Sequence, residues 1–297
     1  MAAQLPADEF PLGYRETEGL KQVRCFVPRH LSSENPAYML KNGISLSLSE
    51  KVAVITGGSR GIGAATVKMF VAAGARVMFS YQRNKNAAEQ VLQACGKGDC
   101  AALNVDLDDH QSAWELIDAT VRRFARVDAL VVNHGIWPPD DAPIDQMSPE
   151  QWQRTVAVNL DSVFGLVKHA VSRMKKQRSG GHVVLVSSTA GQRGEAYHCD
   201  YAATKGALIS MVKGLSTELA PDGIYVNCVA PGWVDTDMAA PALKDGARRR
   251  KVLEKIPLGR PATPEEIAAP ILFLCTEHAG FITGEIFNVN GGAVLVG

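Results

Sequence analysis

A strand, a glycine-rich turn and a helix follow one another directly between residues 51 and 73. Residues 51–56, KVAVIT, form the apolar, β-branched run of a buried strand. The turn that follows is Gly57-Gly58-Ser59-Arg60-Gly61-Ile62-Gly63, and the next residues, AATVKMFVAAG, have a helical pattern. Glycine lets a backbone turn tightly and approach a bound group, while a helix N-terminus offers unpaired N–H groups and a positive dipole end. The spacing is G-x-x-x-G-x-G rather than the common G-x-G-x-x-G, but its context favours a dinucleotide-binding turn over a purely structural one.

The apolar periodicity predicts that strands and helices alternate along the rest of the chain. Strands are expected near 51–56, 75–81, 100–105, 128–132, 182–187, 224–229 and 285–289. Helices are expected near 61–73, 86–95, 109–125, 149–177, 200–220, 240–254 and 264–276. This alternation predicts a doubly wound α/β fold, in which a parallel sheet is covered by helices on both faces. In such a sheet the ligand lies at the carboxyl ends of the strands.

Three polar residues near the fifth predicted strand have the spacing of an acid–base site. Tyr201 and Lys205 are four residues apart in a segment rich in Ala and Leu, so a helix would place both on one face. Ser188 follows the apolar run 183–186. An ammonium about 4 Å from a phenol would favour the phenolate by roughly 4 kcal/mol, which lowers a tyrosine pKa from about 10 to about 7. We therefore expect Tyr201 to exchange protons and Ser188 to hold a carbonyl or alcohol oxygen, although a Tyr-x-x-x-Lys pair alone usually has no function.

With these features in place, the chain from about Leu48 onward resembles the short-chain dehydrogenase/reductase family, in its compact single-domain branch. Further motifs follow in the family's order: Thr56-Gly57-x-x-x-Gly61-x-Gly63, Asp106 in NVDL, Asn133-His134-Gly135, Asn159 in VAVNL, and Pro231-Gly232 with Val234 and Thr236 beyond it. The resemblance implies a Rossmann-type sheet of seven parallel strands in the order 3-2-1-4-5-6-7. It also implies an NAD(P)-dependent enzyme.

The resemblance assigns catalytic roles to four residues. Tyr201 would be the general acid in reduction and the base in oxidation, and Ser188 would bind the reacting oxygen. Lys205 would lower the Tyr201 pKa and hold the nicotinamide ribose, and Asn159 would anchor a water that links Lys205 to solvent. Ser187 competes for the serine role, but Ser188 is preferred because it begins the family's S-x-x-G pattern.

The other motif residues would bind the cofactor. Asp106, with Leu107 beside it, would bond the adenine. The turn after the fourth strand and the nicotinamide-carboxamide motif would contribute Asn133, Gly135, Pro231, Gly232, Val234 and Thr236.

The second predicted strand favours NADP over NAD. Enzymes that use NAD usually place an acid at the end of this strand to bond the ribose 2′-OH, and no acid occurs between Val77 and Ala88. Arg60 and Arg83 could each pair with a 2′-phosphate through two hydrogen bonds. The alternative is that Arg83 and Lys85 are ordinary solvated loop charges.

The substrate is less well specified. His134 replaces the family's usual small residue, and it is either a substrate contact or a histidine hydrogen-bonded in a crowded loop. Together with Trp137, Gln192, Glu195 and His198 it suggests a polar pocket for a sugar, polyol or hydroxy acid, although half of these side chains could point elsewhere. The expected substrate lid, from 235 to about 260, carries no readable motif.

Three functions remain in competition. The first is an NADP-dependent oxidoreductase that interconverts a ketone and a secondary alcohol, either a sugar or polyol dehydrogenase or a 3-oxoacyl-(acyl carrier protein) reductase, which the chain is most similar to. Against a carrier substrate, Asp222 stands where those reductases often have a basic docking residue. The second is a non-catalytic dinucleotide-binding regulator, which would need no proton relay. The third, an epimerase or dehydratase of the family's longer branch, conflicts with the glycine spacing.

Composition narrows the partners. The 297 residues carry no net charge, which argues against nucleic acid and acidic membranes as partners, and the basic run 248–251 is interpreted as a solvated helix face. No stretch approaches the roughly 20 apolar residues of a membrane span.

The six cysteines do not have the spacing of metal ligands, so no metal site is expected, and free thiols suit a cytoplasmic protein. Residues 1–47 form an extension of unknown role before a single NAD(P)-binding domain, 48–297, and the family resemblance implies a homodimer or homotetramer.

Overall fold

Seven parallel strands form one sheet in the part of the chain that the computed structural model describes, residues 45–96 and 98–296. The expected extension, 1–47, therefore lies outside the described residues except for 45–47. The strand order is β3-β2-β1-β4-β5-β6-β7, which confirms the predicted topology. The strands are β1 (Val52–Ile55), β2 (Arg76–Tyr81), β3 (Cys100–Asn104), β4 (Ala129–Val132), β5 (Gly181–Val186), β6 (Ile224–Pro231) and β7 (Ile286–Val289).

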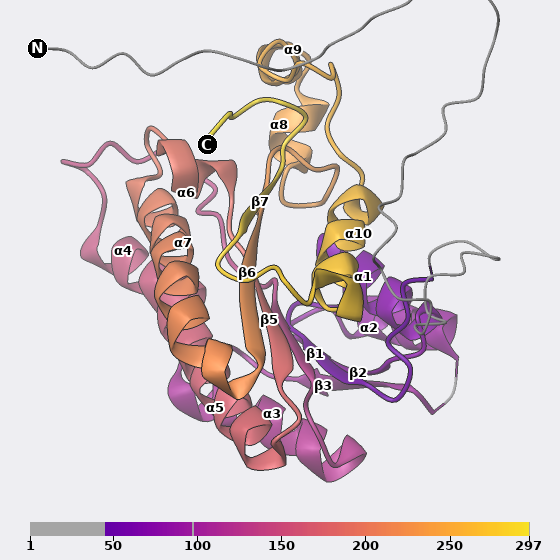
Figure 1. Ribbon diagram of the computed structural model, residues 1–297. Coiled ribbons are helices and arrows are strands. Elements are labelled where there is room, and N and C mark those ends of the chain that lie inside the picture. The colour runs from indigo at the N-terminus through magenta and orange to yellow at the C-terminus, as the bar shows by residue number, and fades with distance from the viewer. Residues whose placement is uncertain (1–44, 97, 297) are drawn as a thin grey trace, which may run out of the picture. The chain divides into compact units, whose positions relative to one another are not determined.

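Helices cover both faces of this sheet, with α1, α2 and α10 on one side and α3, α5 and α7 on the other (Figure 1). The helices are α1 (Gly61–Ala72), α2 (Lys85–Cys95), α3 (His110–Phe124), α4 (Pro149–Val156), α5 (Ser162–Gln177), α6 (Thr189–Arg193), α7 (Cys199–Leu219), α8 (Ala240–Lys244), α9 (Gly246–Leu253) and α10 (Pro264–Leu274). None of those in the described residues is both long and apolar enough to cross a membrane.

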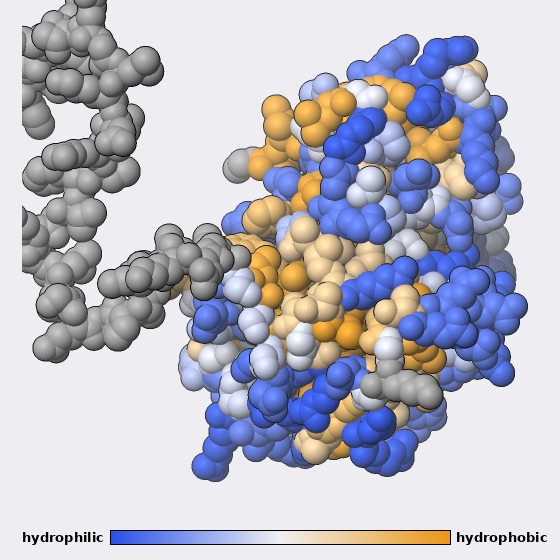
Figure 2. Space-filling view, turned by 90° about the vertical axis from the view of Figure 1, so that its right-hand side faces the viewer, coloured by the Kyte–Doolittle hydropathy of each residue, from blue (hydrophilic) through white to orange (hydrophobic). Residues whose placement is uncertain are grey.

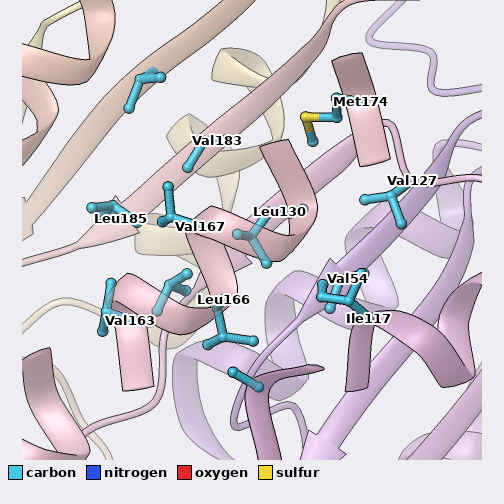
Figure 3. Packing of buried hydrophobic residues seen from close by; sticks show 14 of the residues in the cluster. Val54, Ile117, Val127, Leu130, Val163, Leu166, Val167, Met174, Val183 and Leu185 are labelled. Atoms are coloured by element: carbon cyan, nitrogen blue, oxygen red, sulfur yellow. The ribbon is translucent and has the colours of Figure 1, made fainter. Parts of the chain in front are cut away.

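The apolar core is divided between the two faces by the alternation of side chains along each strand. In β1, Val54 joins the core beneath α3 and α5, whereas its neighbour Ile55 joins the core beneath α1 and α10. Figure 3 shows the first of these cores, where Leu130 and Val183 from the sheet meet Leu166 of α5. Each such fully buried side chain contributes about 1.5–3 kcal/mol to folding.

Three local features differ from the predicted helices. The span 149–177 is interrupted by a π-helical turn, Ala157–Asp161, between α4 and α5. The span 240–254 is divided at Asp245, which is extended and accepts a hydrogen bond from the Arg248 N–H at 2.7 Å, so it caps α9. The short helix α6 was not predicted.

An ion pair with a buried carboxylate holds the amino end of the sheet together. The Asp128 carboxylate accepts two hydrogen bonds from Arg126, at 2.6 and 2.7 Å, and a third from the Val52 N–H at 2.9 Å. Asp128 is buried, whereas the Arg126 side chain is 36% exposed. Loss of the carboxylate would therefore leave Val52 unpaired, while Arg126 could still be solvated.

We expect Asp128→Ala to lower the free energy of unfolding by about 2 kcal/mol, because a buried donor loses an ionised acceptor. Urea unfolding of the purified protein measures this change. Asp118→Ala is the matched control, because Asp118 pairs with Arg122 on the surface of α3 and such pairs contribute about 0.3–0.5 kcal/mol. Equal losses in the two variants would contradict the role given to Asp128.

Candidate active site

The four predicted catalytic residues converge at the carboxyl edge of the sheet. Asn159 lies in the π-helical turn, Ser188 lies two residues beyond the end of β5 and caps α6, and Tyr201 and Lys205 lie in the first two turns of α7. Tyr201 and Lys205 are buried, and the Lys205 Nζ lies 5.7 Å from the centroid of the Tyr201 ring. The Ser188 side chain lies close enough to Tyr201 to lower its pKa. Asn159 and Lys205 both border Gly135, where a methyl group would lie 3.2 Å from Asn159 Oδ1 and 3.4 Å from Lys205 Nζ.

The structure separates the two candidate serines. The Ser187 hydroxyl is buried and donates to the Lys205 carbonyl at 2.7 Å, so it holds α7 against β5. The Ser188 oxygen accepts from the Ala190 N–H at 3.1 Å and lies beside Tyr201. Of the two hydroxyls, therefore, the Ser188 hydroxyl is the one beside the tyrosine.

Burial changes the acid–base properties of the pair in a way that the sequence does not predict. Desolvation raises the pKa of Tyr201 to about 12, with the hydrogen bond from Ser188 opposing this rise and the charge of Glu195 adding to it. Desolvation also lowers the pKa of Lys205 to about 8. The expected lowering of the Tyr201 pKa is thus corrected, because desolvation of the buried phenol dominates, while the Lys205 ammonium donates to the Val186 carbonyl at 2.8 Å. Tyr201 accordingly keeps its proton at neutral pH.

The glycine turn between β1 and α1 is packed too tightly for side chains. Gly57 and Gly61 have φ angles of +64° and +51°, which other residues rarely adopt. A Cβ at Gly63 would lie 2.1 Å from the Gly57 carbonyl oxygen. Asn133 fixes the turn from the end of β4, since its side-chain amide donates to the Thr56 carbonyl at 3.1 Å. The turn and the N-terminus of α1 therefore fit a pyrophosphate group, which needs close approach of the backbone.

We expect Gly63→Ala to weaken NADPH binding about 10- to 100-fold, because the added methyl group forces the turn apart. Fluorescence titration with NADPH measures the affinity. Gly214→Ala is the matched control, because a methyl group at Gly214 in α7 meets no atom within 4 Å and alanine favours a helix by about 1 kcal/mol. Unchanged NADPH affinity in Gly63→Ala would exclude the glycine turn as the pyrophosphate site.

The predicted nicotinamide motif after β6 reaches the same turn. A Cβ at Gly61 would lie 3.0 Å from Thr236 Cγ2, and the Arg60 guanidinium pairs with Asp237 at 2.9 Å. Val234 is buried and pairs with Ala262 in an isolated parallel bridge. The motif begins at Pro231, the last residue of β6, and continues through Gly232, whose N–H donates to the Val289 carbonyl at 3.0 Å.

One cavity lies beside the glycine turn, and a second lies at the end of β3. A cavity of about 490 Å³ is lined by Arg60, Arg83, Asn84, Lys85 and Asn86. It contains three cationic side chains and no acid, and sequence reasoning had not included Asn84 and Asn86.

The second cavity, of about 350 Å³, is acidic and includes Asp106, whose carboxylate lies 3.6 Å from the Arg154 guanidinium. Leu107, the other predicted adenine contact, is only 5% exposed and packs in the core beneath α3. Only the main chain of Leu107 is left to face a nucleotide.

The predicted substrate residues have different surroundings. Trp137 lies against the edge of the Tyr201 ring, with centroids 4.8 Å apart. His198 is buried, its ring centroid lies 3.9 Å from that of Trp137 in a tilted arrangement, and its Nε2 lies 3.2 Å from Asp141. Its Nδ1 is buried without a hydrogen-bond partner among the described residues, so the substrate role of His198 stays a prediction. Gln192 donates to Asn288 of β7 at 2.5 Å.

His134 also has a different environment from the expected substrate contact. Its Nδ1 lies 2.8 Å from the Thr56 hydroxyl and its Nε2 lies 2.8 Å from the Ser162 hydroxyl. Neither ring nitrogen is left to bind a substrate, which agrees with the alternative of a histidine bonded in a crowded loop. Burial, reinforced by the Lys205 charge, lowers the pKa of His134 to about 3, so the ring is neutral.

Comparison with known proteins finds relatives that are named as reductases. Residues 57–294 match the family described as enoyl-(acyl carrier protein) reductase. The chain is 38% identical over 254 residues to the 3-oxoacyl-(acyl-carrier-protein) reductase FabG of Salmonella typhimurium, covering 84% of this chain and 100% of that one. It is 36% identical over 246 residues to acetoacetyl-CoA reductase of Shinella zoogloeoides, covering 83% and 99%.

Solved structures share the fold. A short-chain dehydrogenase/reductase from Brucella melitensis, described as a glucose/ribitol dehydrogenase, superimposes with a TM-score of 0.78 at 33% identity, covering 85% of this chain and 100% of that one. A putative 2-deoxy-D-gluconate 3-dehydrogenase from Agrobacterium tumefaciens, with bound NADP, gives 0.77 at 31% identity, covering 84% and 98%.

Proposed function

The chain belongs to the short-chain dehydrogenase/reductase family, and from this premise we propose that it interconverts a ketone and a secondary alcohol with NADP, using Tyr201 as general acid and base. The observation that carries this proposal is the meeting of Ser188, Tyr201 and Lys205 at the carboxyl edge of the sheet. The regulator hypothesis has no use for such a group of residues.

Different residues at the sheet edge would bind different parts of the cofactor. The glycine turn and the N-terminus of α1 would hold the pyrophosphate, and Lys205 the nicotinamide ribose. Arg60 and Arg83 would pair with the 2′-phosphate in the cationic cavity. When bound there, a nicotinamide cofactor would supply the hydride in reduction and accept it in oxidation.

The catalytic residues would bind the substrate oxygen and transfer a proton to it. The Ser188 hydroxyl would hold the substrate oxygen within reach of Tyr201, which would donate its phenolic proton to that oxygen during reduction. The Lys205 ammonium beside the ring would stabilise the negative charge that develops on the phenol oxygen. Asn159, held by two hydrogen bonds to the Ile136 main chain at 2.8 and 3.0 Å, would anchor a water that links Lys205 to solvent. Lys205 would pass a proton on to the Tyr201 phenolate and regain one from this water.

A pH dependence follows from the two pKa values. Tyr201 stays protonated through neutral pH, whereas Lys205 loses its proton as the pH rises through about 8. We expect kcat for ketone reduction to be flat below that pH and to fall above it, about tenfold per pH unit at the limit. A profile of kcat between pH 6 and 10 measures this, and a rate that stays constant across that range would contradict the role of the ammonium.

The charge at position 222 bears on the substrate class. Asp222, at the position expected for a basic carrier-docking residue, pairs with Lys175 at 2.8 Å. This favours a small hydroxy compound, such as a polyol or sugar acid, over a carrier-bound acyl chain. The relatives named as acyl reductases support the second candidate, a 3-oxoacyl thioester.

A substrate screen tests the proposal. NADPH and NADP consumption would be followed at the nicotinamide absorbance band with keto-sugars, polyols, hydroxy acids and 3-oxoacyl thioesters. We expect turnover with at least one ketone–alcohol pair. Tight NADPH binding without turnover of any of them would favour the regulator instead.

We also propose a homodimer or homotetramer. Three aromatic side chains remain about half exposed on helices α3, α4 and α5: Trp114, Trp152 and Phe164. The opposite face, on the side of α1, α2 and α10, is shown in Figure 2, where hydrophobic residues gather at the centre and hydrophilic ones surround them. Apolar patches of this kind commonly mark contacts between subunits, and light scattering measures the assembled mass.

A further inference from the structure

A chain of hydrogen bonds runs from the nucleotide turn to the catalytic π-helical turn, and His134 is its central link. At one end, the Thr56 hydroxyl accepts from the Asn133 N–H at 2.9 Å and the His134 N–H at 3.1 Å, and it contacts His134 Nδ1 at 2.8 Å. At the other end, His134 Nε2 contacts the Ser162 hydroxyl at 2.8 Å, and that hydroxyl donates to the Val158 carbonyl at 2.8 Å.

The donors and acceptors in this chain fix its polarity. The Thr56 oxygen already accepts two backbone N–H groups, so its single proton is donated to Nδ1 of His134. The Ser162 proton is committed to Val158, so Ser162 accepts the proton on Nε2. The pattern assigns the neutral Nε2–H tautomer to His134, with every donor in the chain satisfied.

The two ends of this chain lie next to different parts of the site. Thr56 directly precedes Gly57, the first residue of the nucleotide turn, and its side chain is completely buried. Val158 directly precedes Asn159, whose side chain is bonded to the main chain of Ile136. π-Helical turns within α-helices are frequent at functional sites. The imidazole thus connects the floor of the nucleotide turn to the element that carries the amide of the catalytic set.

We propose that His134 is a positioning residue that links the nucleotide turn to the π-helical turn. It thereby fixes the position of Asn159 relative to the nucleotide turn that binds the cofactor. The inference rests on the proposed function. His134 touches neither substrate nor cofactor in this role, and it acts through Thr56 and Ser162.

The test compares five variants of the full chain, one of which is the double variant His134→Ala/Ser162→Ala. His134→Ala and Ser162→Ala remove the link, whereas His134→Gln retains it, because the glutamine carbonyl can accept from Thr56 and its amide can donate to Ser162. His182→Ala is the matched control, because this histidine of β5 lies at the amino end of the sheet and stacks on Tyr225, outside the site.

We expect His134→Ala and Ser162→Ala each to lower kcat about tenfold with little change in the Michaelis constant, and His134→Gln to recover most of the rate. The double variant should be no slower than about twice the slower single variant, since residues of one network are not additive. Amide hydrogen exchange of the protein without cofactor should accelerate within 156–163 in His134→Ala, and at no other site by a comparable factor.

Several outcomes overturn the inference. They are an unchanged kcat in His134→Ala, a tenfold loss that His134→Gln does not relieve, multiplicative losses in the double variant, and exchange that accelerates equally everywhere or as much in His182→Ala. An inactive wild-type protein would instead refute the proposed function, and the exchange comparison would still test the structural link.

Discussion

Replacing Tyr201 by Phe is expected to lower kcat about 10²- to 10⁴-fold, the usual contribution of a general acid, while NADPH affinity changes less than about twofold. Phenylalanine keeps the ring that packs edge-on against Trp137, with centroids 4.8 Å apart, so the pocket retains its shape. The substitution removes only the hydroxyl that lies beside Ser188. Steady-state kinetics with the best substrate of the screen, together with fluorescence titration of NADPH, measure both quantities.

Tyr197→Phe is the matched control for this substitution. Tyr197 lies only four residues earlier in the chain, but its side chain is exposed, and its loss of a hydroxyl should leave kcat unchanged. Comparable turnover by Tyr201→Phe and the wild type would exclude Tyr201 as the acid. A loss of NADPH binding in that variant would show that the effect is structural.

The combined substitution of Arg60 and Arg83 by Ala is expected to weaken NADPH about 100-fold and NADH by no more than about threefold. Each charge-assisted hydrogen bond to a phosphate contributes about 1.5–3 kcal/mol, and NADH lacks the 2′-phosphate that these arginines would bind. Titration with both nucleotides measures the ratio. Arg122→Ala, on the exposed side of α3, is the control for the loss of a surface arginine.

Asp237 provides an independent test of the same cavity. Its carboxylate lies 2.9 Å from the Arg60 guanidinium, so it competes with an incoming phosphate for that cation. Asp237→Asn should therefore strengthen NADPH binding and leave NADH unchanged. Equal changes for the two nucleotides, in this variant or in the arginine double variant, would contradict the assignment of the 2′-phosphate.

The features of the fold that depend on local pattern could be predicted from the sequence. The β-branched run 51–56 and the apolar period of 61–73 are set by residues close together in the chain, so the strand, turn and helix are found where they were expected. The π-helical turn was not predictable in this way, because it forms where Asn159 bonds to the main chain of Ile136, which is distant in sequence.

The same distinction applies to the site. The spacing of Ser188, Tyr201 and Lys205 indicates that they meet, but it says nothing about how deeply they are buried. Desolvation is a tertiary property, and it raises the Tyr201 pKa instead of lowering it. The partners of His134 likewise come from other elements, so the sequence could not decide between a substrate contact and a histidine bonded in a crowded loop.

The central claim is that a hydride passes between a nicotinamide and a carbonyl carbon while Tyr201 supplies the proton. The most direct measurement uses NADPH deuterated at the transferable position, with the best ketone of the screen, and mass spectrometry of the alcohol formed. The account predicts one deuterium on the carbinol carbon with the wild-type protein and almost no alcohol with Tyr201→Phe. Alcohol without deuterium, or labelled alcohol formed equally fast by the variant, would contradict it.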